Sequence, residues 1–275
     1  MKKFGIVINE TKDPGHNVAE RISAYLGKYG AESVVLKNAT DLQEEVDCLV
    51  VLGGDGTMLQ AAGETAGKNI GLIGVNLGTL GYLAEVETDN LEEALDKLLR
   101  DDFETEERMM LCGKVEGKDG IREISPALND ISITRCGSLQ IISLKISVNG
   151  KFLCNWKADG IIISTPTGST GYNLSAGGPI VEPGANLIVL TPICAHTLNA
   201  RSIVLKADDM VEIEVARGRH GTKLTVEANS DGSEKLAMET GDKILISKAE
   251  NTTTIIKLSK VSFLEMLHKK MGDLK

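Results

Sequence analysis

The run Cys48-Leu-Val-Val-Leu-Gly-Gly-Asp-Gly-Thr57 is an apolar stretch that stops in a glycine-rich turn carrying one carboxylate. A continuous apolar run is expected of a strand buried on both faces, and the residues after the turn, Met58–Gly63, predict the start of a helix. Gly53, Gly54 and Gly56 can adopt positive φ and add no Cβ, so their backbone N–H groups can close on a phosphate. The positive end of the helix would strengthen that binding.

Asp55 is the unusual member of this turn, because a carboxylate repels a phosphate. It makes chemical sense if it takes a proton from an attacking hydroxyl, or holds a metal that bridges phosphates. The alternative is a tight strand-to-helix turn in which Asp55 caps the helix. The second Gly before Asp55 and the Thr after the turn favour the functional interpretation. Two other phosphate loops are excluded, because the chain has no Gly-x-x-x-x-Gly-Lys-Ser/Thr and Leu59 stands where Gly-x-Gly-x-x-Gly needs its third Gly.

The first 103 residues alternate between strand-like and helix-like patterns. Apolar residues at helical spacing predict helices over 17–28 and 90–100. The strand-like runs lie at 4–9, 33–37, 48–52 and 70–75. This βαβ alternation predicts a doubly wound α/β domain over residues 1–103, with ligands at the carboxyl ends of its strands, where Gly53–Thr57 lies.

The pattern changes near residue 104. Short alternating runs separated by turn signals predict a mostly antiparallel β-sandwich domain over 104–260, with no long helix inside it. The expected strands are 109–116, 123–128, 131–135, 140–148, 152–156, 160–164, 187–191, 203–205, 210–216, 223–228, 242–247 and 253–260. Helical spacing returns at 262–270, and we expect a C-terminal helix within 261–275 that packs on the first domain.

The composition narrows the class of protein. The chain has 275 residues, 42% of them hydrophobic and only 3% aromatic, which predicts one or two globular domains with an aliphatic core. Its net charge of −9 argues against a broad nucleic-acid or anionic-membrane surface, and no apolar run approaches the ~20 residues of a membrane helix. Five scattered cysteines and four scattered histidines form no zinc motif. We therefore expect a cytoplasmic protein with reduced thiols and no nucleic-acid or membrane partner.

A second polar loop follows another apolar strand. Residues 157–179 read Lys-Ala-Asp-Gly-Ile-Ile-Ile-Ser-Thr-Pro-Thr-Gly-Ser-Thr-Gly-Tyr-Asn-Leu-Ser-Ala-Gly-Gly-Pro. The hydroxyls, glycines and tyrosine of this loop suit a sugar and a purine held by short hydrogen bonds, although a polar surface loop would also have such a composition. Asp159 stands at the start of the strand that leads into the loop. The pair Asn129-Asp130 places an amide beside a carboxylate between two strands, a pattern that on its own is typical of a turn.

These motifs together resemble the NAD kinase family. Gly53–Thr57 matches the family's Gly-Gly-Asp-Gly-Thr, Asn129-Asp130 its Asn-Glu/Asp pair, and residues 159–179 its long Asp-Gly…Ser-Thr-Pro-Thr-Gly-Ser-Thr-Ala-Tyr-Asn…Gly-Gly-Pro stretch. Leu190-Thr-Pro-Ile193 follows at the family's spacing. Diacylglycerol-type lipid kinases and phosphofructokinases carry turns like the first motif, whereas the long stretch is peculiar to NAD kinases. The resemblance covers the chain from about Phe4 to its end, in the bacterial type of the family.

The chain departs from the family pattern at four places. Gly171 stands for the usual Ala, and Asp130 for the commoner Glu. Asn229-Ser-Asp-Gly-Ser233 only partly matches an Asp-Gly-Gln turn, and Arg201-Ser202 replaces Arg-Pro. The first two changes are small, because Gly171 keeps its backbone donor and Asp130 keeps its carboxylate.

The resemblance implies transfer of the γ-phosphoryl group of ATP to the 2′-hydroxyl of the adenosine ribose of NAD, which makes NADP. Asp55 would be the catalytic residue that accepts the hydroxyl proton, and Gly53, Gly54, Gly56 and Thr57 would hold the ATP phosphates. The implied NAD contacts are Asp55, Gly56, Tyr82, Asn129, Asp130, Lys157, Asp159, Thr167, Thr170, Gly171, Tyr172, Asn173, Leu174 and Ser175. No protein side chain is implied as a metal ligand, so Mg²⁺ would be carried by the phosphates. Family likeness also implies a homotetramer or homodimer.

Three other functions share part of this pattern. A lipid kinase would share the Asp55 turn, but should show an apolar entrance or a basic membrane face, which this acidic chain does not. A non-catalytic NAD(P) sensor would keep the 159–175 loop and would not need Asp55. A phosphatase would need a water-activating metal cluster, and no such grouping is visible. The sequence leaves open whether polyphosphate also serves as donor, and whether NADH is accepted.

Overall fold

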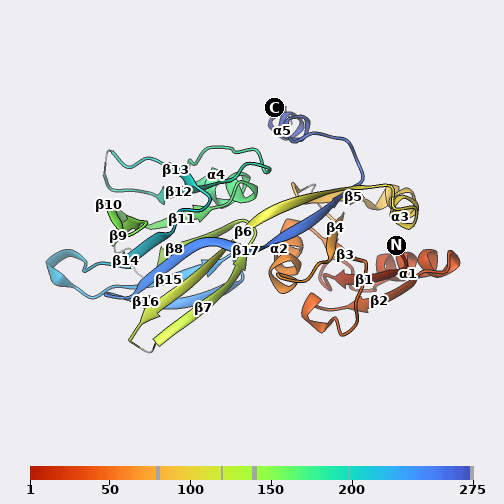
Figure 1. Cartoon of the computed structure of the whole chain (residues 1–275), viewed down its shortest axis with the longest axis horizontal. Coiled ribbons are helices and arrows are strands. Elements are labelled where there is room, and N and C mark those ends of the chain that lie inside the picture. The colour runs from red at the N-terminus through yellow and green to blue at the C-terminus, as the bar shows by residue number, and fades with distance from the viewer. Residues whose placement is uncertain (79–80, 119, 138–140, 198, 273–275) are drawn as a thin grey trace. The chain divides into compact units, whose positions relative to one another are not determined.

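The chain folds into two compact units. The computed structural model describes residues 1–78, 81–118, 120–137, 141–197 and 199–272. Unit 1 comprises Met1–Arg108 with Thr253–Lys275, and unit 2 comprises Met109–Thr252. Figure 1 labels the helices and strands of both. The domain boundaries expected from the sequence, 103/104 and 260/261, lie a few residues away from these.

Unit 1 is built on a parallel sheet. The strand order is β2 (Glu32–Leu36), β1 (Lys3–Ile8), β3 (Cys48–Gly53) and β4 (Gly71–Asn76). On its other side β4 pairs with β5 (Ala84–Glu87) and with the end of β17 (Lys243–Lys257). Every residue of β3 is buried, as its apolar run predicts.

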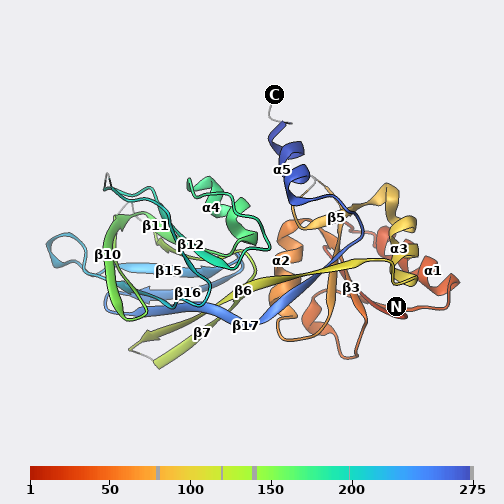
Figure 2. The same ribbon diagram turned by 45° about the horizontal axis from the view of Figure 1, so that its top comes forward.

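Helices cover both faces of this sheet. Phe4 and Val50 share one apolar cluster with α1 (Asn17–Lys28) and α3 (Leu91–Leu99). The other face packs on α2 (Asp55–Glu64), where a Cβ at Gly74 would lie 3.0 Å from the Met58 sulfur. Figure 2 shows α2 on one side of the sheet and α1 with α3 on the other. The expected doubly wound α/β architecture is confirmed. Unit 1 also includes α5 (Phe263–Gly272) and the short turns Ala39–Asp41 and Thr88–Asn90.

Unit 2 is a β-sandwich of antiparallel strands. One sheet has the order β13-β12-β11-β8-β15-β16, and the other contains β10-β9-β14-β17, with β6 paired to both β17 and β7. The bounds are β6 Glu104–Gly117, β7 Gly120–Ala127, β8 Asp130–Arg135, β9 Ile142–Val148, β10 Lys151–Ala158, β11 Gly160–Ser164, β12 Leu187–Ile193, β13 Ile203–Lys206, β14 Val211–Val215, β15 Thr225–Ser230 and β16 Glu234–Glu239. Short helical turns occupy Thr167–Thr170, Tyr172–Ser175 (α4) and Arg219–Gly221.

Alternate residues of both sheets form one buried core. Ile131 and Ile133 of β8 meet Leu144 and Ile146 of β9 in the same cluster, and Trp156 joins it. The period-two pattern of the sequence therefore places one face of each strand inside the sandwich. The expected antiparallel β-sandwich is confirmed.

Three strand predictions differ from the structure. The runs 242–247 and 253–260 were expected as two strands, but β17 continues through the exposed polar residues between them, because its pairing with β6 satisfies the backbone there. Strands β5 and β16 were missed, since both are short and rich in charged residues. Gln140 and residues 273–275 of the expected elements lie outside the described residues.

None of the helices in the described part of the chain combines the length and the apolar character that crossing a bilayer requires.

Candidate active site

The glycine-rich turn joins β3 to α2, as the sequence predicts. Gly54 is the N-cap of α2 with extended backbone, φ −124° and ψ −167°, and Asp55 is the first helical residue. The Asp55 side chain does not cap the helix, so the interpretation of Asp55 as a helix cap is wrong. Its carboxylate reaches outside the helix and is available for other partners.

Positive φ does not explain the glycines of the turn, and lack of space explains only Gly53. Gly53 and Gly56 are not among the described glycines with positive φ. A Cβ at Gly53 would lie 2.2 Å from Thr57 Oγ1, and one at Gly54 would lie 3.0 Å from Lys12 Nζ. A Cβ at Gly56 would meet no atom within 4 Å. The turn is therefore closely packed at its start and open over Gly56, where a ligand can approach the backbone.

Three backbone amides hold the Asp55 carboxylate. Oδ2 accepts a hydrogen bond from the Tyr82 N–H at 2.8 Å, and Oδ1 accepts bonds from Leu83 at 2.9 Å and Ala84 at 3.4 Å. A Cβ at Gly81 would lie 1.8 Å from Oδ1, so only glycine fits beside the carboxylate. An ionised carboxylate offers about four acceptor positions. The three amides fix its orientation and leave it able to accept a further hydrogen bond.

Lys12 is a functional candidate that the sequence reasoning missed. The Asn9 Nδ2 group donates to Thr57 Oγ1 at 3.2 Å, while Asn9 Oδ1 accepts bonds from the N–H and the hydroxyl of Thr11. The Lys12 N–H donates to the Asn9 carbonyl at 2.9 Å. Asn9 thus ties the loop after β1 to the turn and brings the Lys12 ammonium over Gly54. A lone lysine after the first strand was the only signal in the sequence.

Tyr82 lies beside the turn and under a lysine of α5. The Lys270 ammonium is 3.6 Å from the centre of the Tyr82 ring, a cation–π contact. Burial, and then the negative charge of Asp55, raises the pKa of Tyr82. Burial lowers the pKa of Lys270, and the charge of Asp55 opposes that shift. Unit 1 therefore places two cations, Lys12 and Lys270, near the Asp55 turn.

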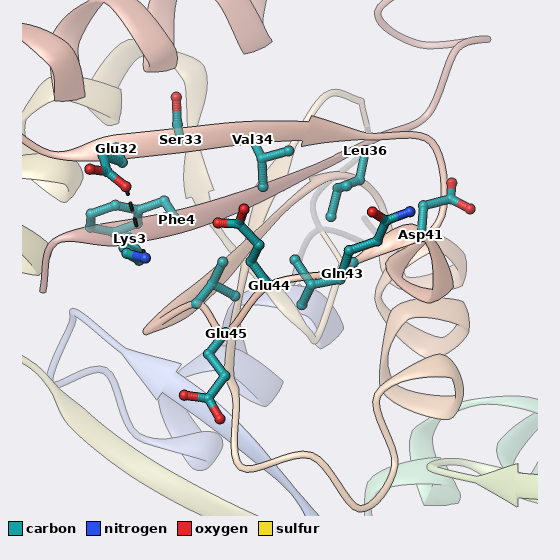
Figure 3. Close-up of a pocket in the computed structure, with 12 residues that line it drawn as sticks. Lys3, Phe4, Glu32, Ser33, Val34, Leu36, Asp41, Gln43, Glu44 and Glu45 are labelled. Carbon is teal, nitrogen blue, oxygen red and sulfur yellow. Dashed lines mark ion pairs between the residues drawn. The ribbon is translucent and has the colours of Figure 1, made fainter.

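An open pocket of about 410 Å³ at the turn is lined by Asn9, Lys12, Gly54, Asp55, Gly56, Thr57, Gln60 and Gly81. A different hollow of about 260 Å³ lies against β1 and β2, where Figure 3 shows Glu32, Glu44 and Glu45 along it. Those carboxylates would repel a phosphate. The pocket at the Asp55 turn instead combines the Lys12 ammonium with the open backbone of Gly56. Within the described residues, no three or more His, Cys, Asp or Glu side chains converge as metal ligands.

In unit 2 the predicted Asn129 lies against the predicted loop. Thr165 donates its N–H to the Asn129 carbonyl at 2.9 Å and its hydroxyl to the Leu128 carbonyl at 2.6 Å. A Cβ at Gly168 would lie 2.1 Å from the Asn129 carbonyl oxygen, and one at Gly171 would lie 3.3 Å from Asn129 Nδ2. The glycines of the loop thus allow it to close on Asn129, which brings two separate motifs together.

Asp130 is a buried acid beside a second acid. It begins β8 and is only 6% exposed. Burial, and then the charge of Asp231, raises the pKa of Asp130 to about 7. Burial also raises the pKa of Asp231, while backbone N–H bonds from residues 128–130 oppose the shift. The motif therefore carries a carboxyl that changes its charge near neutral pH.

Asp159 and Lys157 lie at the other end of β11. Asp159 precedes Gly160, whereas Ser164 pairs with Asp130, and a five-residue strand spans about 16 Å. The Asp159 carboxylate forms an ion pair with Arg135 at 3.2 Å, a partner that the sequence did not indicate. Lys157 is exposed on β10. Burial, and then the charges of Asp130, Cys194 and Asp159, raise the pKa of Tyr172. The acids at the two ends of β11 therefore both act on this tyrosine.

The remaining predicted contacts divide by exposure. Tyr172, Leu174 and Ser175 are exposed on α4, whereas Thr167 is buried and Thr170 partly buried. Asn173 is fully buried and fixes the loop: its Nδ2 donates to the carbonyls of Ser169 and Pro179, and its Oδ1 accepts from the Thr191 hydroxyl. The exposed residues are therefore the ones whose side chains can meet a ligand.

Comparison with known proteins gives the family. Residues 28–103 match the model of the ATP-NAD kinase N-terminal domain, and residues 128–258 match that of the ATP-NAD kinase C-terminal domain. The NAD kinase of Agathobacter rectalis is 45% identical over 99% of both chains, and that of Citrifermentans bemidjiense is 40% identical over 98% of both.

Two solved structures are also similar. The NAD kinase of Archaeoglobus fulgidus in complex with ATP has a TM-score of 0.78 and 25% identity, covering 94% of this chain and 95% of that one. The yeast NADH kinase complexed with NADH has a TM-score of 0.88 at 23% identity, covering 100% of this chain and 89% of that one, and shares the fold. This chain belongs to the NAD kinase family.

Proposed function

We propose that this protein transfers the γ-phosphoryl group of ATP to the 2′-hydroxyl of the adenosine ribose of NAD and so makes NADP. The observation that carries this proposal is the Asp55 carboxylate, which three backbone amides orient beside a cavity that also holds the glycine turn and Lys12. Phosphoryl transfer depends mainly on positioning and charge compensation. A fixed acceptor for the hydroxyl proton beside phosphate donors supplies both.

On the donor side, the backbone of the turn, the start of α2 and Lys12 bind the triphosphate. The open side of Gly56 gives phosphate oxygens access to backbone N–H groups. Lys12 supplies a positive charge at the phosphates, which matters because the chain as a whole carries a net charge of −9. Gly53 and Thr57 keep the turn closed through their mutual contact.

On the acceptor side, Asn129 and the loop 167–172 hold the adenosine half of NAD. The exposed ring of Tyr172 offers a flat face, and the Asn129 amide offers a donor and an acceptor. Asp130 and Ser175 bind the nicotinamide riboside, Asp159 contacts NAD from the other end of β11, and Lys157 lies near a phosphate. The Asp55 carboxylate then accepts the 2′-hydroxyl proton as the oxygen attacks the γ-phosphorus. Gly56, Tyr82, Thr167, Thr170, Gly171 and Leu174 complete the proposed NAD contacts, and Asn173, whose buried side chain fixes the loop, supports them.

The proposal includes a Mg²⁺ ion carried by the ATP phosphates, the usual way in which a nucleotide brings this ion. Such an ion neutralises charge on the phosphate oxygens. We include two further properties in the proposal: assembly as a homotetramer or homodimer, and a cytoplasmic location, which the five free cysteines support. Whether polyphosphate also serves as donor is left to the experiment.

The experiment compares NADP formation by the wild type and by Asp55→Asn, with NAD, Mg²⁺ and either ATP or polyphosphate. We expect the variant to keep its KM for NAD within a few-fold and to lose about 100-fold or more in kcat, because it cannot accept the proton. Near-normal turnover would reduce Asp55 to a structural residue.

Asp47→Asn is the matched control. Asp47 also accepts two backbone hydrogen bonds, from Lys2 and Lys3, but it precedes β3 whereas Asp55 follows it. Both variants lose an amide-bound carboxylate of unit 1, so a loss of kcat confined to Asp55→Asn is chemical and not structural.

A further inference from the structure

Asp231 occupies the tip of the hairpin between β15 and β16. It has φ 47° and Gly232 has φ 75°, and the Ser233 N–H donates to the Ser230 carbonyl at 2.9 Å. Two successive residues with positive φ closed by this bond have the pattern of a type I′ turn, which lies within the three-residue connection 231–233, because Ser230 pairs with Glu234. Asp-Gly is a favoured sequence for such a turn. The backbone conformation therefore accounts for the glycine at position 232 and is compatible with aspartate at position 231.

The Asp231 side chain does more than the turn requires. Its Oδ2 accepts the Leu128 N–H at 2.7 Å, and its Oδ1 accepts the N–H groups of Asn129 and Asp130, both at 2.9 Å. The Asp231 N–H donates in return to the Asp130 carbonyl at 3.1 Å. One carboxylate thus fixes three successive residues of the segment that leads into β8.

Neighbouring residues of the same hairpin hold the segment before this one. The Ser230 hydroxyl donates to the Ser125 carbonyl at 2.8 Å, and the Ser125 N–H donates to Glu234 at 2.6 Å. The whole connection from β7 to β8 is therefore attached to the hairpin tip. Its far side meets the loop, where the Asn129 carbonyl and amide lie against Gly168 and Gly171.

An acid is a costly choice at this position. Asp231 lies close enough to the buried Asp130 for its charge to raise the pKa of that carboxyl. Asn-Gly forms the same type I′ turn without a charge. Charge-assisted bonds to backbone N–H groups are stronger than neutral ones, which gives a physical reason for the acid: it holds the Asn129 backbone tightly.

We propose that Asp231 is a positioning residue for NAD, because its carboxylate clamps the backbone of residues 128–130 and thereby directs the Asn129 amide toward the 168–171 loop. The proposal rests on the proposed function, since Asn129 is assigned there to the adenosine half of NAD. Asp231 itself need not touch the substrate. Residues 229–233 match the family's Asp-Gly-Gln turn only in part. The proposal gives the Asp of that turn, Asp231, a physical role.

The test uses Asp231→Asn and Asp231→Gly. Both residues favour positive φ and type I′ turns, so the hairpin is kept while the charge, or the whole side chain, is removed. Asp242→Asn is the matched control: Asp242 is 8% exposed, closes the turn that leads from β16 to β17, and accepts the Glu239 N–H at 2.9 Å.

The first readout is hydrogen exchange of the amides of residues 128–130 in the protein without substrates. We expect exchange to speed up by about tenfold or more in Asp231→Gly, less in Asp231→Asn, and not in Asp242→Asn. Unchanged protection of these amides in Asp231→Gly overturns the proposal, and this readout does not depend on any activity.

The second readout is steady-state kinetics of NADP formation. We expect the KM for NAD to rise about tenfold in Asp231→Gly, with kcat and the KM for ATP within about twofold of the wild type. An unchanged KM for NAD, or a rise confined to the KM for ATP, overturns the positioning role. Failure of the proposed function is distinguishable, because the wild type itself would then form no NADP.

Discussion

Replacement of Asp130 by asparagine should make the stability of unit 2, relative to the wild type, rise with pH. The Asp130 carboxyl is 6% exposed, and burial with the nearby charge of Asp231 raises its pKa to about 7, from 3.8. The folded chain therefore keeps a proton on Asp130 between about pH 4 and pH 7, where the unfolded chain has lost it. Stability consequently falls as pH rises through this range.

The magnitude follows from the same values. A pKa raised from 3.8 to about 7 corresponds to about 4 kcal/mol of unfolding free energy lost between pH 4 and pH 8. An asparagine side chain at this position carries no charge at any pH and so avoids this loss. The stability of Asp130→Asn relative to the wild type should therefore rise with pH, by an amount that approaches this value.

The assay is urea unfolding at pH 5 and pH 8, followed by fluorescence of Trp156. This residue is the single tryptophan of the chain and is buried in the core of unit 2, so its signal reports that unit. Between pH 5 and pH 8 the difference amounts to about 2.7 kcal/mol, because the folded-state pKa of about 7 lies two pH units above 5. This moves the midpoint by about 1.4 M at a slope of about 2 kcal/mol/M. A relative stability that is the same at both pH values, or that falls with pH, would refute the reasoning.

Three further changes test single parts of the site. Lys12→Met should raise the KM for ATP by about five- to tenfold and leave the KM for NAD unchanged. Lys28→Met on α1 is its control, and an equal rise of the KM for ATP in both variants would reject Lys12 as a phosphate ligand. Gly81→Ala places a Cβ 1.8 Å from Asp55 Oδ1 and should lower kcat about tenfold or more, whereas Gly27→Ala has open space and should not. Asn129→Ala and Asp159→Ala should mainly raise the KM for NAD, and an effect on the KM for ATP alone would place them on the donor side.

The sequence predicted the elements whose signals are local. The apolar run before Gly53 and the helical spacing over 17–28 need no distant partner to be recognised, and β3 and α1 lie where expected. The same holds for β11 at 160–164, which leads into the loop. Strands β5 and β16 depend on pairing with β4 and β15 for their stability, and their own charged residues gave no pattern.

The site could be predicted as motifs but not as contacts. Asp55, Asn129 and the loop were found from residue types in sequence. The sequence did not indicate the amides of residues 82–84 at Asp55, the ion pair of Arg135 with Asp159, or the hydrogen bonds of Asp231. Each joins residues far apart in the chain, and only strand register and the packing of loops bring them together.

The measurement that tests the central claim most directly is ³¹P NMR of the product formed from NAD and ATP. We expect a phosphate monoester on the 2′-hydroxyl of the adenosine ribose, because a fixed adenosine presents one hydroxyl to Asp55 and a misplacement of about 1 Å can cost about 100-fold in rate. The NAD analogue without this 2′-hydroxyl should bind as an inhibitor and accept no phosphate, whereas the analogue without the 3′-hydroxyl should still react. A 3′-phosphate, or phosphate transferred to the 2′-deoxy analogue, would contradict the account.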